Sequence, residues 1–126
     1  MSVILIVEDN EKNMKLVRDI LQHKGHTTLE AMTGGEGVRL AVEGRPDLIL
    51  MDIQLPDIDG IAALGRIRAD PALDGVPVLA VSASVMPDEQ QKIVASGFDA
   101  YVMKPINLKP FLETVQRYLA GGRRPA

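Results

Sequence analysis

The sequence predicts an α/β fold, a single (βα)5 domain with one parallel five-stranded sheet. Two patterns carry this prediction. Short apolar runs rich in Val, Ile and Leu recur along the chain, and segments with helical spacing of apolar residues separate them. The runs do not alternate with polar residues, which is typical of parallel strands buried on both faces. The length of 126 residues suits one domain with one core.

Composition argues against several classes of function. The formal net charge is −3, so the chain has no overall positive field that would attract nucleic acid, and we expect no direct DNA binding. Cys is absent, which removes disulfides and thiolate metal sites. No apolar stretch approaches membrane-spanning length, and no leader precedes the first strand. We therefore expect a cytoplasmic protein that does not enter a membrane.

The first third of the chain predicts a strand, a helix and a second strand. Residues 3–7 form a buried strand, because all five are Val, Ile or Leu. Asn10 is a candidate N-cap for the helix that follows, and Gly25 ends that helix. Residues 27–31 are half polar, which favours an edge position in the sheet.

The central part of the chain changes abruptly from apolar to acidic residues. Residues 33–44 begin with capping-box spacing and predict a short helix. Four apolar residues then lead into Asp52, which places this acid at the carboxyl end of a buried strand. A loop containing Pro and Gly follows, and residues 60–70 form a helix that Pro71 ends.

The last third continues the alternation of strand and helix. Residues 78–81 form a buried strand with Ser82 at its end, and residues 87–96 form a helix whose middle is polar throughout. Residues 100–103 form a short strand, and Lys104 follows it directly. This part of the chain therefore adds two more strands to the sheet.

A final helix begins after Asn107, a candidate N-cap, and carries the clearest amphipathic stripe in the chain. Residues 1–120 thus make the domain, and residues 121–126 are expected to be a flexible tail. A helix in each crossover implies parallel strands with helices on both faces. Five strands suit the doubly wound, flavodoxin-like order 2-1-3-4-5. We expect Met32, Met51 and Met103 in the core.

Charged and polar residues stand at the ends of four predicted strands. Glu8 and Asp9 follow the first strand, Asp52 ends the third, Ser82 the fourth, and Lys104 follows the fifth. The carboxyl ends of parallel strands meet at one rim, where open α/β sheets place their ligand sites. Three carboxylates together repel, so they favour a bound cation, and all-oxygen donors favour a hard ion such as Mg²⁺. With an ammonium and a hydroxyl beside them, they predict a phosphoryl-transfer site.

At these positions the sequence resembles the receiver domains of two-component response regulators. The similarity covers residues 3–120 and rests on four motifs in order: Val7-Glu8-Asp9-Asn10, Leu50 to Pro56 with Gly60, Val81-Ser82-Ala83 and Lys104-Pro105. Asn10, Asn13 and the run from Asp52 to Pro56 resemble the stand-alone, DivK-like subgroup. Receivers fused to hybrid histidine kinases share this signature.

The resemblance implies that the chain is a phosphorylation-switched signalling module. Asp52 would be the phosphoacceptor that attacks a phosphohistidine, with Lys104 paired to the phosphoryl group and Ser82 bonded to it. The donor would be a histidine kinase or a histidine phosphotransferase protein, and a downstream protein would be the target. We expect no turnover enzyme, and a monomer that can dimerise when phosphorylated.

The same resemblance implies a metal site and a switch. The metal ligands would be Glu8, Asp9, Asp52 and the backbone carbonyl of Gln54, and the ion would be Mg²⁺ or Mn²⁺. The switch would consist of Ser82 and Tyr101, which change the surface of the fourth helix and its flanking strands. Packing within a strand is an equal alternative for Tyr101.

Each residue at the strand ends also has a purely structural interpretation. Asp52 can start a turn, and Glu8 and Asp9 can favour a helix N-terminus. Lys104 can be a solvated cation, and Ser82 can be a cap or a buried hydroxyl. Their joint occurrence at the ends of four strands favours the site.

Three other functions fit part of the pattern. A phosphatase of the haloacid-dehalogenase type would need a second Asp where the chain has Gln54. A flavodoxin-like cofactor binder would need a phosphate-binding loop, but Glu8 and Asp9 stand there and would repel a phosphate. A receiver that acts as a phosphate-insensitive scaffold would not need the complete set of site residues.

Overall fold

The computed structural model describes residues 2–83 and 87–122, without the side chain of Val94. The strands are β1 (Val3–Val7), β2 (Thr27–Ala31), β3 (Leu48–Asp52), β4 (Val78–Ser82) and β5 (Ala100–Met103). The helices are α1 (Glu11–His23), α2 (Gly34–Gly44), α3 (Gly60–Arg68), α4 (Pro87–Ala95) and α5 (Leu108–Gly121). A 3-10 turn, η1 (Pro71–Leu73), lies between α3 and β4.

All five strands are parallel and lie in the order β2-β1-β3-β4-β5, which confirms the prediction. The central strand β3 is buried at every position, whereas the half-polar β2 forms an edge. Val7 pairs with Met51, and Asp52 pairs with Val81. The carboxyl ends of β1, β3 and β4 are therefore level, and the residues that follow them emerge at one rim of the sheet.

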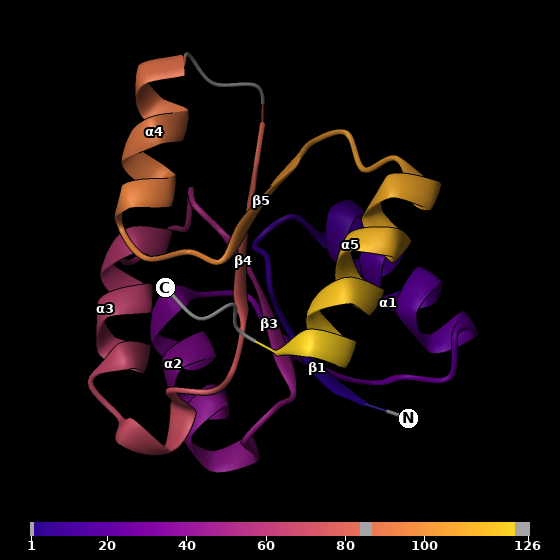
Figure 1. The fold of residues 1–126 in the computed structure, drawn as a ribbon, viewed down its shortest axis with the longest axis horizontal. Coiled ribbons are helices and arrows are strands. Elements are labelled where there is room, and N and C mark those ends of the chain that lie inside the picture. The colour runs from indigo at the N-terminus through magenta and orange to yellow at the C-terminus, as the bar shows by residue number, and fades with distance from the viewer. Residues whose placement is uncertain (1, 84–86, 123–126) are drawn as a thin grey trace.

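Two helical layers enclose the sheet. Figure 1 shows α1 and α5 on one face and α2, α3 and α4 on the other. The side chains of β1 divide between the two cores: Ile4 and Ile6 pack with α1 and α5, and Leu5 and Val7 pack on the opposite face. Because both faces are covered, the strands carry apolar residues at consecutive positions. In the described part of the chain, no helix combines the length and the apolar character needed to cross a bilayer.

The first two helices, α1 and α2, begin with capping side chains. Asn10 accepts a hydrogen bond from the backbone N–H of Asn13 at 3.1 Å, as its position before α1 predicts. Thr33 caps α2 in the same way, but Glu36 bonds to the backbone of Met32 at 3.3 Å rather than to Thr33. The predicted capping box is therefore only half formed.

Three expectations about the second half of the chain were wrong or incomplete. Asn107 occupies the N-cap position of α5, but its side chain makes no capping hydrogen bond. Met103 is 48% exposed, because it ends the edge strand β5, whereas Met51 is fully buried and Met32 is partly buried against the core. The helix expected over residues 60–70 ends at Arg68, because Asp70 caps η1 instead. Of the expected tail, residues 123–126 lie outside the described residues.

Candidate functional site

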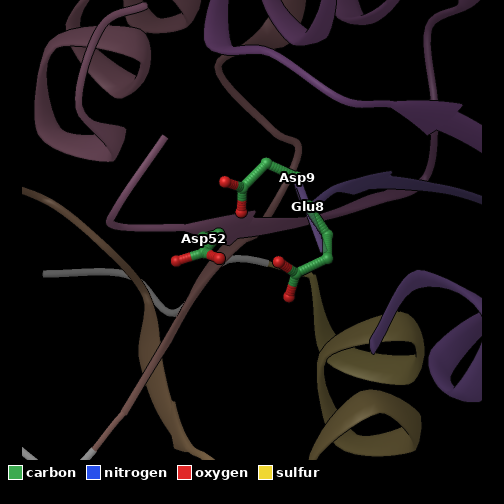
Figure 2. A group of neighbouring side chains, drawn as sticks. All are labelled: Glu8, Asp9 and Asp52. Carbon is green, nitrogen blue, oxygen red and sulfur yellow. The ribbon is translucent and has the colours of Figure 1, made fainter. Parts of the chain in front are cut away.

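Three carboxylates meet at the carboxyl ends of β1 and β3. Glu8 and Asp9 follow β1, and Asp52 is the last residue of β3. One carboxylate oxygen from each residue lies within 4.8 Å of the others. Figure 2 shows the three side chains gathered from the two strand ends. Glu8 and Asp52 are each 4% exposed and Asp9 is exposed, so two buried acids and one solvent-facing acid form the cluster.

Lys104 supplies a positive charge to the two buried acids. Its Nζ lies 2.8 Å from Glu8 Oε1 and donates to Asp52 Oδ2 at 3.0 Å. The backbone N–H of Lys104 donates to the carbonyl of Ser82 at 2.7 Å, which extends the pairing of β4 and β5 up to the site. The Lys104–Pro105 peptide bond is cis. Buried charges are stable only when they are paired, and this ammonium pairs with both carboxylates.

The charges at the site influence one another's protonation. The pKa of Glu8 is raised to about 7, first by burial and then by the neighbouring Asp52, although the bonds from Lys104 and the Asn10 amide lower it in part. Burial alone would lower the pKa of Lys104, but its bonds to Glu8 and Asp52 raise that pKa above the ordinary value. Three carboxylates against one ammonium leave an excess of acidic groups.

The loop after β3 holds Asp52 tightly. The backbone N–H of Gln54 donates to Asp52 Oδ1 at 2.9 Å, so each oxygen of Asp52 has a donor. The backbone N–H of Gly60 donates to the carbonyl of Ile53 at 2.8 Å. A Cβ atom at Gly60 would lie 2.5 Å from the carbonyl oxygen of Asp52, so only glycine permits this close return of the chain.

Ser82 and Tyr101 lie on the neighbouring strands β4 and β5. Ser82 is the last residue of β4, is buried, and lies at the same rim as Asp52. The hydroxyl of Tyr101 donates to the carbonyl of Ala83 at 3.1 Å. The side chain of Tyr101 is thus hydrogen-bonded to the residue that directly follows Ser82. The structure therefore brings every predicted site residue to this rim or directly beside it.

One contact beside the site was not predicted. Asp57, expected only as a loop residue, accepts hydrogen bonds from the backbone of Gly34 and Gly35 at the start of α2. These partners precede Asp57 by 23 and 22 residues, and no local pattern indicates such a pairing. Only the tertiary arrangement reveals it.

The donor set fits a hard divalent cation. All candidate ligands are oxygens, three of them carboxylates, and no thiolate or imidazole takes part. The three carboxylates outnumber the ammonium of Lys104 that pairs with two of them, so a divalent cation would reduce their mutual repulsion. Mg²⁺ suits such a site, because it is bound through a few carboxylates and keeps its remaining positions for water and phosphate oxygens.

The sequence matches a known protein family over most of its length. Residues 4–116 match the family described as the response regulator receiver domain. The polar-differentiation response regulator DivK of Brucella anthropi is 45% identical over 116 residues, which are 92% of this chain and 94% of that protein.

Solved structures agree with this match. The receiver domain of the sensor histidine kinase PA1611 from Pseudomonas aeruginosa PAO1 is 31% identical, with a TM-score of 0.88 over 94% of this chain and 98% of that one. It is described with a magnesium ion coordinated in its active site cleft. A CheY-like receiver protein from Methanospirillum hungatei JF-1 is 30% identical, with a TM-score of 0.86 over 96% of this chain and 95% of that one.

The fold and the acidic rim were predicted from the alternation of strands and helices and from the residues at the strand ends, and the similarities to known proteins confirm the resemblance to receiver domains. Such domains are phosphoacceptors rather than turnover enzymes, their phosphodonors are histidine kinases, and they bind Mg²⁺ at an acidic site like the one formed by Glu8, Asp9 and Asp52. The chain belongs to the response regulator receiver domain family.

Proposed function

We propose that Asp52 is the phosphoacceptor of this response regulator and that Lys104 and Ser82 assist the transfer. The observation that carries the proposal is the contact of 3.0 Å between Lys104 Nζ and Asp52 Oδ2, beside two further carboxylates. A carboxylate nucleophile next to a fixed ammonium is suited to phosphoryl transfer, in which positioning and charge neutralisation do most of the catalysis.

The proposed transfer exchanges one bond to phosphorus for another. A carboxylate oxygen of Asp52 attacks the phosphorus of a phosphohistidine, and a P–O bond forms while the P–N bond breaks. The electron pair of that bond returns to the imidazole nitrogen, and the donor ring, protonated on its other nitrogen, leaves neutral. Lys104 then pairs with a phosphoryl oxygen instead of Asp52 Oδ2, and the hydroxyl of Ser82 donates to another.

We propose that the carboxylates of Glu8, Asp9 and Asp52 and the backbone carbonyl of Gln54 hold Mg²⁺ or Mn²⁺. When bound, the ion supplies positive charge to the phosphoryl oxygens. Glu8 and Asp52 are buried and already oriented by Lys104, so they need little rearrangement to serve as ligands. Gln54 lies two residues after Asp52 and is bonded to it through its own N–H.

We propose that Ser82 and Tyr101 transmit the phosphorylated state to the protein surface. The hydroxyl of Tyr101 is attached to the carbonyl of Ala83, which directly follows Ser82. A movement of Ser82 toward the phosphoryl group would displace this carbonyl and release the hydroxyl. Tyr101 would then adopt a new position, and the surface formed by α4, β5 and α5 would change.

The proposed partners follow from this chemistry. A histidine kinase or a histidine phosphotransferase protein supplies the phosphoryl group, and a downstream protein recognises the altered surface. We propose that the chain is a monomer that can dimerise when phosphorylated. We place it in the cytoplasm, because phosphohistidine donors obtain their phosphoryl group from ATP.

The test of the phosphoacceptor is incubation with phosphoramidate and Mg²⁺, followed by intact-mass and peptide mass spectrometry. Wild-type protein should gain one phosphoryl group on Asp52, and hydroxylamine should remove it. Asp52→Asn should gain none, whereas Asp59→Asn, which changes another acid of the neighbouring loop, should still react. An unmodified wild-type protein, or a phosphoryl group on another residue, would reject the proposal.

A further inference from the structure

The loop between β3 and α3, residues 53–59, is attached to the start of α2 by the side chain of Asp57. Asp57 Oδ1 accepts a hydrogen bond from the backbone N–H of Gly34 at 2.8 Å, and Oδ2 accepts one from Gly35 at 2.9 Å. The next two N–H groups of α2 bond to Thr33. Asp57 therefore accepts hydrogen bonds from the two N–H groups in the first turn of α2 that do not bond to the N-cap residue Thr33.

The contact is charged and close. The backbone N–H groups of Gly35, Ile58 and Gly34 lower the pKa of Asp57 to about 2, so its side chain is a carboxylate at neutral pH. A Cβ atom at Gly34 would lie 2.5 Å from Ile58 Cγ1, and one at Gly35 would lie 3.1 Å from Asp57 Oδ2. Two consecutive glycines thus allow the loop to lie directly on the helix start.

The same loop carries the proposed backbone ligand. Gln54 lies between two fixed points, because its own N–H bonds to Asp52 and the loop is held again at Asp57. The segment that precedes α2 is also connected to the site. The backbone N–H of Glu8 donates to the carbonyl of Ala31 at 2.9 Å, just before the turn into α2. Asp57 therefore links the strand end of one metal ligand to the loop of another.

We propose that Asp57 is a positioning residue for the Mg²⁺ site: by clamping the β3–α3 loop to α2, it fixes the direction of the Gln54 carbonyl. The inference rests on the proposed function, which makes that carbonyl a ligand. Asp57 does not itself belong to the carboxylate cluster of Glu8, Asp9 and Asp52. Residues that orient metal ligands without touching the ion commonly change metal affinity about 10–100-fold when they are replaced.

The test compares two acids of one loop by isothermal titration calorimetry with Mg²⁺ at constant ionic strength. Asp57→Ala removes both hydrogen bonds of the clamp, and Asp57→Asn removes one of them, because the NH₂ group of asparagine cannot accept a hydrogen bond. Asp59→Ala and Asp59→Asn are the matched controls, because Asp59 is also exposed and accepts its hydrogen bond from Ala62 of its own helix at 2.7 Å. We expect the Asp57 variants to raise the Kd for Mg²⁺ about tenfold. The Asp59 variants should change it by less than about twofold, because the loss of one exposed charge is largely screened.

A second measurement does not depend on the metal. In Mg²⁺-free buffer, amide hydrogen exchange followed by NMR should be slow at Gly34 and Gly35 in wild-type protein and faster in the Asp57 variants. The Asp59 variants should leave these two amides unchanged. If Asp57→Ala fails to fold, Asp57→Asn decides the question, because it keeps the shape of the side chain and one acceptor oxygen.

The possible outcomes separate this inference from the proposed function. Equal Kd values for the Asp57 and Asp59 variants, with wild-type protein binding Mg²⁺, would overturn the clamp and leave the ligand assignment intact. Unchanged amide exchange at Gly34 and Gly35 in the Asp57 variants would also overturn it. A wild-type protein that does not bind Mg²⁺ would reject the ligand assignment and the clamp together.

Discussion

Lys104 shows at the scale of one residue how charge organises the site. Its ammonium contacts both Glu8 and Asp52, and its side chain is 19% exposed. Removal of one partner from a buried ion pair leaves the other charge uncompensated, which costs more than the pair itself contributes. The stability of the metal-free protein should therefore depend strongly on this residue.

We expect Lys104→Met to lower the free energy of unfolding by about 3 kcal/mol in Mg²⁺-free buffer, measured by urea denaturation. The same variant should bind Mg²⁺ more tightly than wild type, because the ammonium no longer competes for the two carboxylates. Lys109→Met, which removes an exposed charge at the start of α5, is the control and should change neither quantity appreciably. Equal stability of the two variants would contradict the role given to Lys104.

Asp57 gives a prediction for the pH dependence of stability. Its pKa is about 2 in the folded protein and 3.8 ordinarily, so folding favours the ionised form. The resulting stabilisation is fully present well above pH 3.8 and is lost as the pH falls through about 2. Urea denaturation of wild type and Asp57→Asn should thus give a constant difference above pH 5 that narrows below pH 4. A difference that does not change with pH would show that the carboxylate has no special role.

Single residues differ in how far the sequence could predict them. Glu8, Asp52 and Lys104 could be placed together because each stands at the end of an apolar run, and parallel strands end at one rim. The contact of Asp57 with α2 could not be predicted, because it joins a loop to the start of a distant helix, and their approach depends on the packing of α2 against α3. Asn107 has the correct residue type and position for a cap, yet its side chain makes no capping bond.

Helix α3 contains two glycines in opposite surroundings. Gly60 begins the helix, and a Cβ atom there would lie 2.5 Å from the carbonyl oxygen of Asp52. Gly65 lies in the helix interior, is exposed, and would place a Cβ atom with nothing within 4 Å. One glycine is therefore required by the site, and the other only weakens the helix.

We expect Gly65→Ala to raise the free energy of unfolding by about 0.5–1 kcal/mol, because alanine has the higher helix propensity. Gly60→Ala should lower it by about 2 kcal/mol, because the added methyl group must displace the backbone of Asp52. Gly60→Ala should also weaken Mg²⁺ binding, whereas Gly65→Ala should not. Chemical denaturation and calorimetry measure both effects, and a stabilising Gly60→Ala substitution would contradict the packing described for the loop.

Secondary structure elements were predictable where periodicity and caps agree. All five strands and five helices were expected, and the edge position of β2 followed from its half-polar sequence. The 3-10 turn η1 was not expected. The pair Asp70-Pro71 was interpreted only as the end of the preceding helix, but Asp70 also caps η1 and Pro71 is its first residue. A three-residue helix leaves no periodic signal that could have distinguished it from a loop.

At the scale of the whole molecule, the strand order places the site. Because β1 and β3 are neighbours and β4 follows β3, acids that are far apart in the sequence converge at one rim. The rule that helical crossovers are right-handed restricts five alternating units to few arrangements, so this order was accessible from the sequence. Contacts at the opposite end of the sheet could not be predicted from the sequence. The pair formed by Arg68 and Asp99, at 3.1 Å, joins segments that no sequence pattern connects.

The central claim is that carboxylates from β1 and β3 form one divalent-cation site beside Lys104. A crystal structure of the protein with Mn²⁺, with an anomalous difference map, tests this claim most directly. The account predicts one strong peak enclosed by Glu8, Asp9, Asp52 and the carbonyl of Gln54. A peak at another place on the protein with this cluster empty, or carboxylates that point to different faces of the molecule, would contradict it.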